Sequence, residues 1–212
     1  MAVLASGGID SACLLEWARR RTRGAVYPVY VSFGLRWEAC ERKALARFLR
    51  KIRTPGGRLQ GLAILSAPAR DIYGDHWSLT GRGVPGARSP DAAVYLPGRN
   101  LLMLSKVSVF CAKFKIDHVA IGTLAANPFK DAAPGFFSAF SKIASLALGR
   151  HVHVIAPFRR MTKHELVKQY AHLPLHLCFS CLQPIKPSGK PCGRCNKCVE
   201  WRNALSRQSY CL

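Results

Sequence analysis

The segment Ser6-Gly7-Gly8-Ile9-Asp10-Ser11 carries the clearest chemical signal in this sequence, because it joins a short apolar run to a helix-like stretch. A strand that turns through two glycines into a helix directs unpaired backbone N–H groups and the positive end of the helix dipole at one point, where an anion is stabilised. Gly7 and Gly8 let phosphate groups approach the backbone, and the hydroxyls of Ser6 and Ser11 add donors. The segment predicts a pyrophosphate-binding loop, with a serine-glycine turn capped by Asp or Ser as the alternative.

Asp10 is the unusual member of this loop, since a carboxylate beside phosphate groups is repelled unless a cation lies between them. We therefore expect Asp10 to hold Mg²⁺, and Asp10 and Ser11 to take part in catalysis. The sequence contains no G-x-x-x-x-G-K-[ST] loop, so transfer of a γ-phosphate has no motif of its own.

Five of the nine cysteines lie within twenty-one residues near the end of the sequence, beginning at Cys178. Three of them form a C-x2-C-x2-C pattern, and the proline- and glycine-rich stretch before it lets an earlier cysteine return to the same centre. Four thiolates make a tetrahedral zinc site, and five are present. A disulfide framework and an iron–sulfur cluster are the alternatives. The zinc ligands that we expect are Cys181, Cys192, Cys195 and Cys198.

The cellular compartment of the protein helps to decide between a metal site and disulfides. The sequence opens without a charged-then-apolar leader and has no apolar run long enough to span a bilayer, so we expect a cytoplasmic protein with no membrane association. The cytoplasm keeps thiols reduced, which favours a metal over disulfides.

Apolar strand-like runs alternate with helical stretches along the chain, which predicts one α/β domain with a Rossmann-like parallel sheet flanked by helices. We place this domain at residues 1–172 and a zinc-binding segment packed on it at 173–212. The expected strands cover residues 2–5, 27–33, 62–65, 118–121 and 151–155. The expected helices cover residues 12–22, 37–51, 101–114 and 134–148.

In such a sheet, ligands bind at the carboxyl ends of the strands, near the point where the strand order reverses. Ser6 and Gly122 each follow an expected strand, as do residues 32–36. Residues 67–95 are rich in Gly and Pro and include Trp77, and they are too long for a simple connection. They fit a substrate lid, with a mobile surface loop as the alternative.

The chain is strongly basic, with 32 Lys and Arg against 11 Asp and Glu, a formal net charge of +21. Such a surface attracts polyanions, steering ATP and a carboxylate substrate into a cleft or binding nucleic acid non-specifically. An evenly solvated basic surface is the simpler interpretation.

The glycine-rich loop resembles the S-G-G-x-D-S loop of the N-type ATP pyrophosphatases, which cleave ATP between the α and β phosphates and adenylate a substrate. Loop and cysteines together resemble the 7-cyano-7-deazaguanine synthase (QueC) family over almost the whole chain. The other matching motifs are Tyr95-Leu96-Pro97-Gly98-Arg99-Asn100 (Y-x-P-G-R-N), Ile121-Gly122 with Phe129-Lys130-Asp131 (I-G and Y-P-D), Pro157 to Glu165 (P-x5-K-x-E), and Ser180-Cys181 with the three later cysteines and Arg202.

The resemblance implies a ligase that forms C–N bonds from ATP, ammonia and 7-carboxy-7-deazaguanine, in queuosine biosynthesis. The acid would be adenylated and converted to an amide, and a second ATP would carry the amide to the nitrile. Ser6, Gly7, Gly8, Asp10 and Ser11 would bind ATP, and Lys163 would neutralise phosphate charge. Arg99, Asn100 and Asp131 would contact the substrate. The expected cofactors are ATP, Mg²⁺ and Zn²⁺, and a homodimer is among the expected partners.

The sequence departs from the family where C-R-P is expected after Y-P-D, since Ala132-Ala133-Pro134 stands there. The tyrosine and proline before Asp131 are replaced by Phe129 and Lys130. These changes fall on the expected substrate wall. They keep two alternatives open, a tRNA-modifying enzyme with the same loop and a paralogue acting on a different acid or on a macromolecule.

Overall fold

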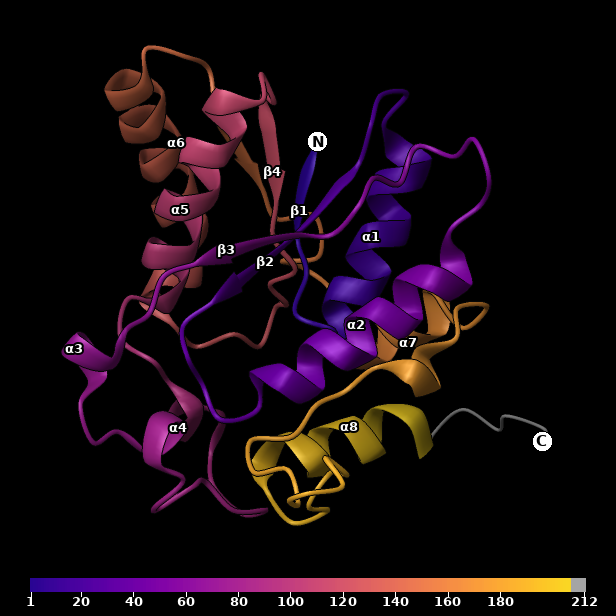
Figure 1. Ribbon diagram of the computed structural model, residues 1–212, viewed down its shortest axis with the longest axis vertical. Helices are drawn as coiled ribbons and strands as arrows, with labels where there is room; N and C mark the ends of the chain where they lie inside the picture. The colour runs from indigo at the N-terminus through magenta and orange to yellow at the C-terminus, as the bar shows by residue number, and fades with distance from the viewer. Residues whose placement is uncertain (207–212) are drawn as a thin grey trace.

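A computed structural model describes residues 1–206, so the last six residues of the expected C-terminal segment lie outside the described residues. Its centre is a sheet of five parallel strands in the order β3-β2-β1-β4-β5 (Figure 1). Every strand that the sequence predicts is present, and the Rossmann-like α/β fold is confirmed. The strands are β1 (Ala2–Leu4), β2 (Tyr27–Ser32), β3 (Ala63–Ser66), β4 (His118–Ala120) and β5 (His153–Ile155).

Helices cover both faces of the sheet, as Figure 1 shows. Successive side chains of β1 point to opposite faces: Val3 packs with α1 and α2, whereas Ala2 and Leu4 pack with α5 and α6. Because helices cover both faces at the centre of the sheet, β1 and most of β2 are buried without alternation, whereas the edge strand β3 exposes every second residue. The long helices are α1 (Ile9–Arg21), α2 (Glu38–Ile52), α5 (Arg99–Lys113) and α6 (Pro134–Leu148), followed by the shorter α7 (Lys163–Gln169) and α8 (Asn196–Ser206).

Local signals account for several helix ends. Pro134 occupies the first turn of α6, and Gly149 ends that helix in the left-handed region. At α7, the side chain of Thr162 accepts the backbone N–H of Glu165, whose carboxylate in turn accepts the backbone N–H of Thr162. This capping box fixes the start of α7 and therefore the position of Lys163 in its first turn.

The four predicted helices are confirmed, with ends that differ by up to three residues. The largest difference is at α1, which begins at Ile9 instead of residue 12, so the helix starts directly at the glycine loop. The sequence analysis did not predict α7, because seven residues are too few for a clear helical period. It also did not predict the four-residue helices α3 (Arg70–Tyr73) and α4 (Trp77–Thr80) within residues 67–95.

Residues 67–95 are tied to the C-terminal segment rather than lying free on the surface. The backbone N–H of Asn196 donates to the carbonyl oxygen of Pro85 at 3.1 Å. The side-chain amide of Asn196 donates to the carbonyl oxygen of Ser89 at 2.8 Å. Arg36 donates to the carbonyl oxygen of Thr80 at 2.6 Å. In Figure 1 these residues and the yellow C-terminal segment form a layer below the sheet.

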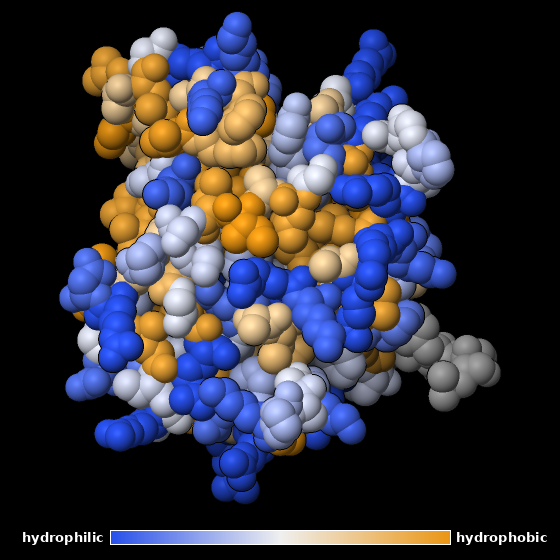
Figure 2. Space-filling model, viewed as in Figure 1, coloured by the Kyte–Doolittle hydropathy of each residue, from blue (hydrophilic) through white to orange (hydrophobic). Residues whose placement is uncertain are grey.

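The surface divides into two parts in Figure 2. An apolar band crosses the face above, where the edge strand β3 leaves Ile64 half exposed. The part below, over α2 and the C-terminal segment, is mostly hydrophilic. Among the described residues, the helices are all too short or too polar to cross a bilayer.

Candidate active site and metal centre

Ser11 is the hub of the glycine loop. Its Oγ accepts hydrogen bonds from the backbone N–H groups of Ser6 and Gly7, both at 3.2 Å, and donates one to the carbonyl oxygen of Gly8 at 2.9 Å. Gly8 caps α1 without a side-chain hydrogen bond, so the first N–H groups of this helix have no side-chain acceptor. A turn of this kind can hold a phosphate-sized anion.

Gly7 is required at its position by both conformation and space. Its φ is +85°, a region that L side chains rarely adopt, and a Cβ placed there would lie 2.6 Å from the carbonyl oxygen of Glu41. The carbonyl oxygen of Gly7 accepts the backbone N–H of Phe179 at 2.9 Å. The loop is thus held between α2 and the C-terminal segment.

Four charged side chains form a chain beside the loop. The Nζ of Lys163 lies 2.6 Å from Oδ1 of Asp10 and 3.0 Å from Oε1 of Glu200, and Nζ of Lys197 lies 2.5 Å from Oε2 of Glu200. Burial acts to lower the pKa of Lys163, but the two carboxylates raise it above its ordinary value. Burial acts to raise the pKa of Glu200, but the two lysines lower it. Lys163 and Glu200 are therefore charged at neutral pH.

A cleft opens at the carboxyl ends of β1, β2 and β4, where the strand order reverses. Opposite the loop, Asn100 and Asp131 form its far wall. The backbone N–H of Asn100 donates to Oδ2 of Asp131 at 2.9 Å, and its side-chain amide donates to the carbonyl oxygen of Asp131 at 3.1 Å. Asp131 therefore caps the start of α5, and its carboxylate keeps lone pairs for a ligand.

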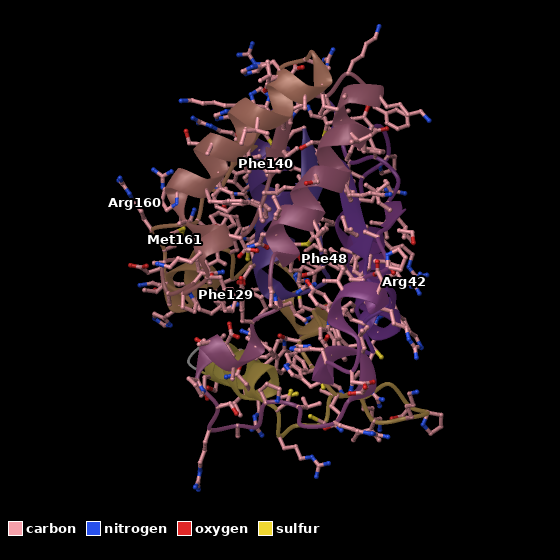
Figure 3. The ribbon with its side chains drawn as sticks, turned by 90° about the vertical axis from the view of Figure 1, so that its left-hand side faces the viewer. Arg42, Phe48, Phe129, Phe140, Arg160 and Met161 are labelled. Carbon is pink, nitrogen blue, oxygen red and sulfur yellow. The ribbon has the colours of Figure 1, made fainter. Side chains whose placement is uncertain are left out.

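Aromatic residues border this wall. The rings of Tyr95 and Phe129 lie 4.9 Å apart, and both residues line the cleft. Figure 3 shows Phe129 at the level where the layer of α5 and α6 meets the C-terminal segment below it. The cleft thus combines polar groups with flat apolar surfaces suited to a planar ring system.

Arg99 is a cation that lines this cleft and makes no direct ion pair within residues 1–206. Its guanidinium carbon lies 5.9 Å from the centroid of the Phe33 ring. Its Nε is buried and has no hydrogen-bond partner among residues 1–206. A buried donor left unpaired is costly unless a ligand satisfies it, so Arg99 fits an anionic ligand.

Glu41 is a half-buried acid near the loop that the sequence analysis did not identify. The hydroxyl of Tyr30 donates to its Oε2 at 2.7 Å. Burial raises the pKa of Glu41 to about 7, although Arg99 and the bond from Tyr30 act to lower it. Glu41 can therefore take or release a proton near neutral pH.

A second cavity adjoins the cleft between the loop and the C-terminal segment. Its walls include Glu41, Lys163 and Phe179. The rings of Trp37 and Trp77 stack over each other, with centroids 5.7 Å apart and planes inclined by 19°. Both tryptophans line this cavity, so residues 67–95 contribute to its wall through Trp77.

The four predicted zinc ligands come together. The Sγ atoms of the four cysteines lie within 4.8 Å of one another. Zn–S bonds of about 2.3 Å place the sulfurs of a tetrahedral site about 3.8 Å apart, so this donor set fits zinc. Backbone N–H groups of Leu182 and Gln183 donate to two of the sulfurs at 3.4 and 3.3 Å. The cysteines of this cluster, which could hold a metal ion, are Cys181, Cys192, Cys195 and Cys198.

Cys178 does not belong to this cluster. Its side chain packs in the apolar core between the sheet and α1, and burial raises the pKa of its thiol to about 12. Cys178 therefore lies outside the group of four cysteines, and its role as the extra thiol stays a prediction.

The structure brings most of the predicted site residues to the same cleft. Gly7 supports the loop from beneath, and Gly8 and Lys163 line the adjoining cavity. Glu41 and Glu200 were missed, because their partners Tyr30 and Lys163 lie on other elements and no local motif links them. The predicted residues that line the cleft itself are Ser6, Asp10, Ser11, Arg99, Asn100 and Asp131.

Comparisons with known proteins agree with this geometry. The model of one protein family, described as "Queuosine biosynthesis protein QueC", matches residues 1–209. The 7-cyano-7-deazaguanine synthase of Anaeromyxobacter sp. (strain Fw109-5) is 30% identical over 217 residues, covering 96% of this chain and 90% of that protein. The 7-cyano-7-deazaguanine synthase 1 of Desulfitobacterium hafniense (strain Y51) is 26% identical over 214 residues, covering 99% of this chain and 92% of that protein.

A solved structure supports the fold alone. A predicted subunit of tRNA methyltransferase from Methanocaldococcus jannaschii aligns with a TM-score of 0.50 at 13% identity. The alignment covers 81% of this chain and 74% of that one.

Proposed function

Because this chain belongs to the QueC family of queuosine biosynthesis proteins, we propose that it converts 7-carboxy-7-deazaguanine and ammonia to 7-cyano-7-deazaguanine at the expense of ATP. The observation that carries the proposal is that one cleft contains both an anion-binding loop and a polar wall. Ser6 and Ser11 lie on one side of the cleft, and Asn100 and Asp131 on the other. This arrangement brings a nucleotide phosphate and a second small molecule into contact.

The proposed chemistry begins at the carboxylate of the substrate. A carboxylate is a poor acyl donor because its leaving group would be an oxide ion. Attack of its oxygen on the α-phosphate of ATP gives an acyl adenylate and pyrophosphate, and ammonia then displaces AMP to give the amide. Attack of the amide oxygen on a second ATP, followed by loss of AMP and a proton, gives the nitrile. Both rounds need the same contacts around the α-phosphate.

The residues of the loop would position and neutralise charge rather than react covalently. The N–H groups of Gly7 and Gly8 and the hydroxyls of Ser6 and Ser11 would hold the pyrophosphate. Lys163 would offset the negative charge that grows on it, since its Nζ already lies at the loop beside Asp10.

Asp10 can bind a cation through one of its two carboxylate oxygens. Its Oδ1 is paired with Lys163, and its Oδ2 has no hydrogen bond or ion pair within the described part of the chain. Carboxylate oxygen is a ligand that Mg²⁺ prefers, and Mg²⁺ bound there would screen the phosphates from Asp10. The zinc site would serve the fold, since four thiolates leave no open position for water.

The deazapurine would bind at the polar wall. The Asp131 carboxylate would accept hydrogen bonds from the amidine-like edge of the ring, with Arg99 facing an anionic group. Ala132 and Ala133 carry no polar side-chain atom, so recognition would rest on Asp131 and Asn100. Their mutual hydrogen bonds hold both in place before the substrate arrives.

Glu41 would serve as a proton acceptor for the incoming ammonia, because it lines the adjoining cavity beside the loop. A group whose pKa lies close to the working pH is efficient in this role.

The test is the product spectrum of the purified protein given ATP, ammonia and 7-carboxy-7-deazaguanine. We expect the nitrile together with AMP and pyrophosphate. ADP and phosphate as the only nucleotide products, or a tRNA modified in place of the free acid, would overturn the proposal.

A further inference from the structure

A third cavity, of about 560 Å³, lies between α2, the zinc-binding segment and α8. Cationic side chains from all three elements line it: Lys43 and Arg47 from α2, Lys190 from the segment, and Arg202 from α8. No aspartate or glutamate lines it. We call these four residues and the space between them the basic cavity.

Among residues 1–206, no acidic side chain pairs with the four cations of the basic cavity. Within residues 1–206, none of their side chains makes an ion pair or a hydrogen bond, whereas Lys163 and Lys197 nearby are both paired with Glu200. Like charges gathered at one place repel each other, and this cost is offset when an anion binds.

The exposed side of α2 extends the positive surface beyond the basic cavity. Its two acids point inward: Glu38 accepts the backbone N–H of Phe33 at 2.6 Å, and Glu41 accepts the hydroxyl of Tyr30. The outer side therefore carries only positive charge. Figure 3 shows Arg42 at the outer edge of the molecule, and Figure 2 shows a hydrophilic surface over this helix. The exposed basic residues of α2 are Arg42, Lys43, Arg47, Arg50 and Lys51.

We propose that the basic cavity and the adjoining side of α2 bind a single strand of nucleic acid through its phosphodiester backbone. A helix of 15 residues is about 22 Å long, so the positive surface is too extended for one phosphate or one free nucleotide. Trp201 is only half-buried and also lines the cavity, where its ring offers a flat surface on which a base can stack. Positive charge and aromatic rings along one path are the features that bind single strands.

The four cations lie outside the proposed ATP cleft, although Phe179 and Ser180 line both the basic cavity and the cavity beside the loop. None of the four cations lines the cleft or the cavity that adjoins it. The inference therefore does not rest on the proposed function, and binding can be measured on a protein that makes no nitrile.

The test is the binding of a fluorescein-labelled single-stranded RNA of about twelve nucleotides, followed by fluorescence anisotropy. The purified protein is titrated at NaCl concentrations between about 50 and 200 mM. The cavity variant carries Lys43→Gln and Arg47→Gln. The matched control carries Lys106→Gln and Lys142→Gln, which remove the same charge from exposed positions on α5 and α6.

We expect the cavity variant to bind roughly tenfold more weakly at low salt, and its salt slope to be shallower by about 1.4, the value for two lost phosphate contacts on a single strand. The control should change affinity by less than about threefold. Equal losses in the two variants would show diffuse attraction and overturn the proposal.

Three competitors identify the kind of ligand that binds. Unlabelled single-stranded DNA should displace the RNA, because both carry the same backbone. Displacement by saturating ATP would place the strand in the cleft and overturn the proposal. Displacement by polyglutamate as effective as by unlabelled RNA at equal charge would favour an acidic protein and would also overturn it.

Discussion

The Nζ of Lys163 lies 2.6 Å from Oδ1 of Asp10, although 153 positions separate the two residues in the chain. Asp10 is in the first turn of α1, and Lys163 is in the first turn of α7. The ion pair of Lys163 with Glu200 adds α8 to the same group. The glycine loop is therefore linked through charged side chains to the helix that carries Cys198.

Replacement of Lys163 by Met should lower kcat/KM for nitrile formation by about two orders of magnitude, because a charge at the developing pyrophosphate is lost. Lys168→Met is the matched control, since Lys168 is exposed on the same helix, and it should leave activity unchanged. Steady-state kinetics of both variants check this. A Lys163→Met enzyme within about threefold of the unaltered one would contradict the role of Lys163.

Replacement of Gly7 by Ala should lower the free energy of unfolding by about 2 kcal/mol or more, since φ is positive and the new Cβ meets the carbonyl of Glu41. Gly8→Ala is the control, because φ at Gly8 is −82° and its Cβ would make only ordinary contacts, the nearest at 3.5 Å. The free energy of unfolding of Gly8→Ala should change by less than about 0.5 kcal/mol. Urea unfolding of both proteins measures the difference, and equal stabilities would contradict the account of the loop.

Each of the four clustered cysteines should be needed for zinc. Replacement of Cys181, Cys192, Cys195 or Cys198 by Ser should lower zinc content and stability together, because the binding energy of such a site is also folding energy. Elemental analysis and thermal unfolding report the two quantities.

Cys178→Ser is the control for this set, since its thiol lies outside the cluster, and it should keep one zinc per chain. Zinc retained by Cys181→Ser but lost by Cys178→Ser would reverse the ligand assignment. A brown protein containing iron and labile sulfide would exclude zinc.

Much of the fold could be predicted from the sequence because its strands are short apolar runs between turn residues. Helix α6 was predicted at both ends, since Pro134 and Gly149 mark them. Helix α7 was missed because its seven residues are too few to show a clear helical period. The division into domains at residue 172 stays a prediction, as does the homodimer.

The site was predictable where chemistry lies in a contiguous motif, as in the glycine loop and the cysteines. It was not predictable where function depends on long-range contacts. Glu41 becomes unusual only because the fold buries it against Tyr30, and Glu200 only because α8 lies beside Lys163. The twin role of Asp131, as a helix cap and as a wall of the cleft, also requires the folded chain.

Glu41 should make stability fall as pH rises. Its pKa is about 7 in the folded protein and 4.5 in the reference state, so the folded form holds its proton more tightly. This contribution is fully present below the unfolded pKa and is lost as pH rises through the folded pKa. The free energy of unfolding measured with urea should therefore fall between about pH 4.5 and 7. This fall should be smaller in the Glu41→Gln variant. An identical pH profile in the variant would contradict the shifted pKa of Glu41.

The most direct test of the central claim, that the cleft adenylates a carboxylate, is to follow oxygen from the substrate. 7-Carboxy-7-deazaguanine labelled with ¹⁸O in both carboxyl oxygens is incubated with ATP, ammonia and the protein. The masses of the products are then measured by mass spectrometry. Attack on the α-phosphate in both rounds predicts one ¹⁸O in each AMP, none in pyrophosphate and none in the nitrile. Label in pyrophosphate or inorganic phosphate, with unlabelled AMP, would contradict the account.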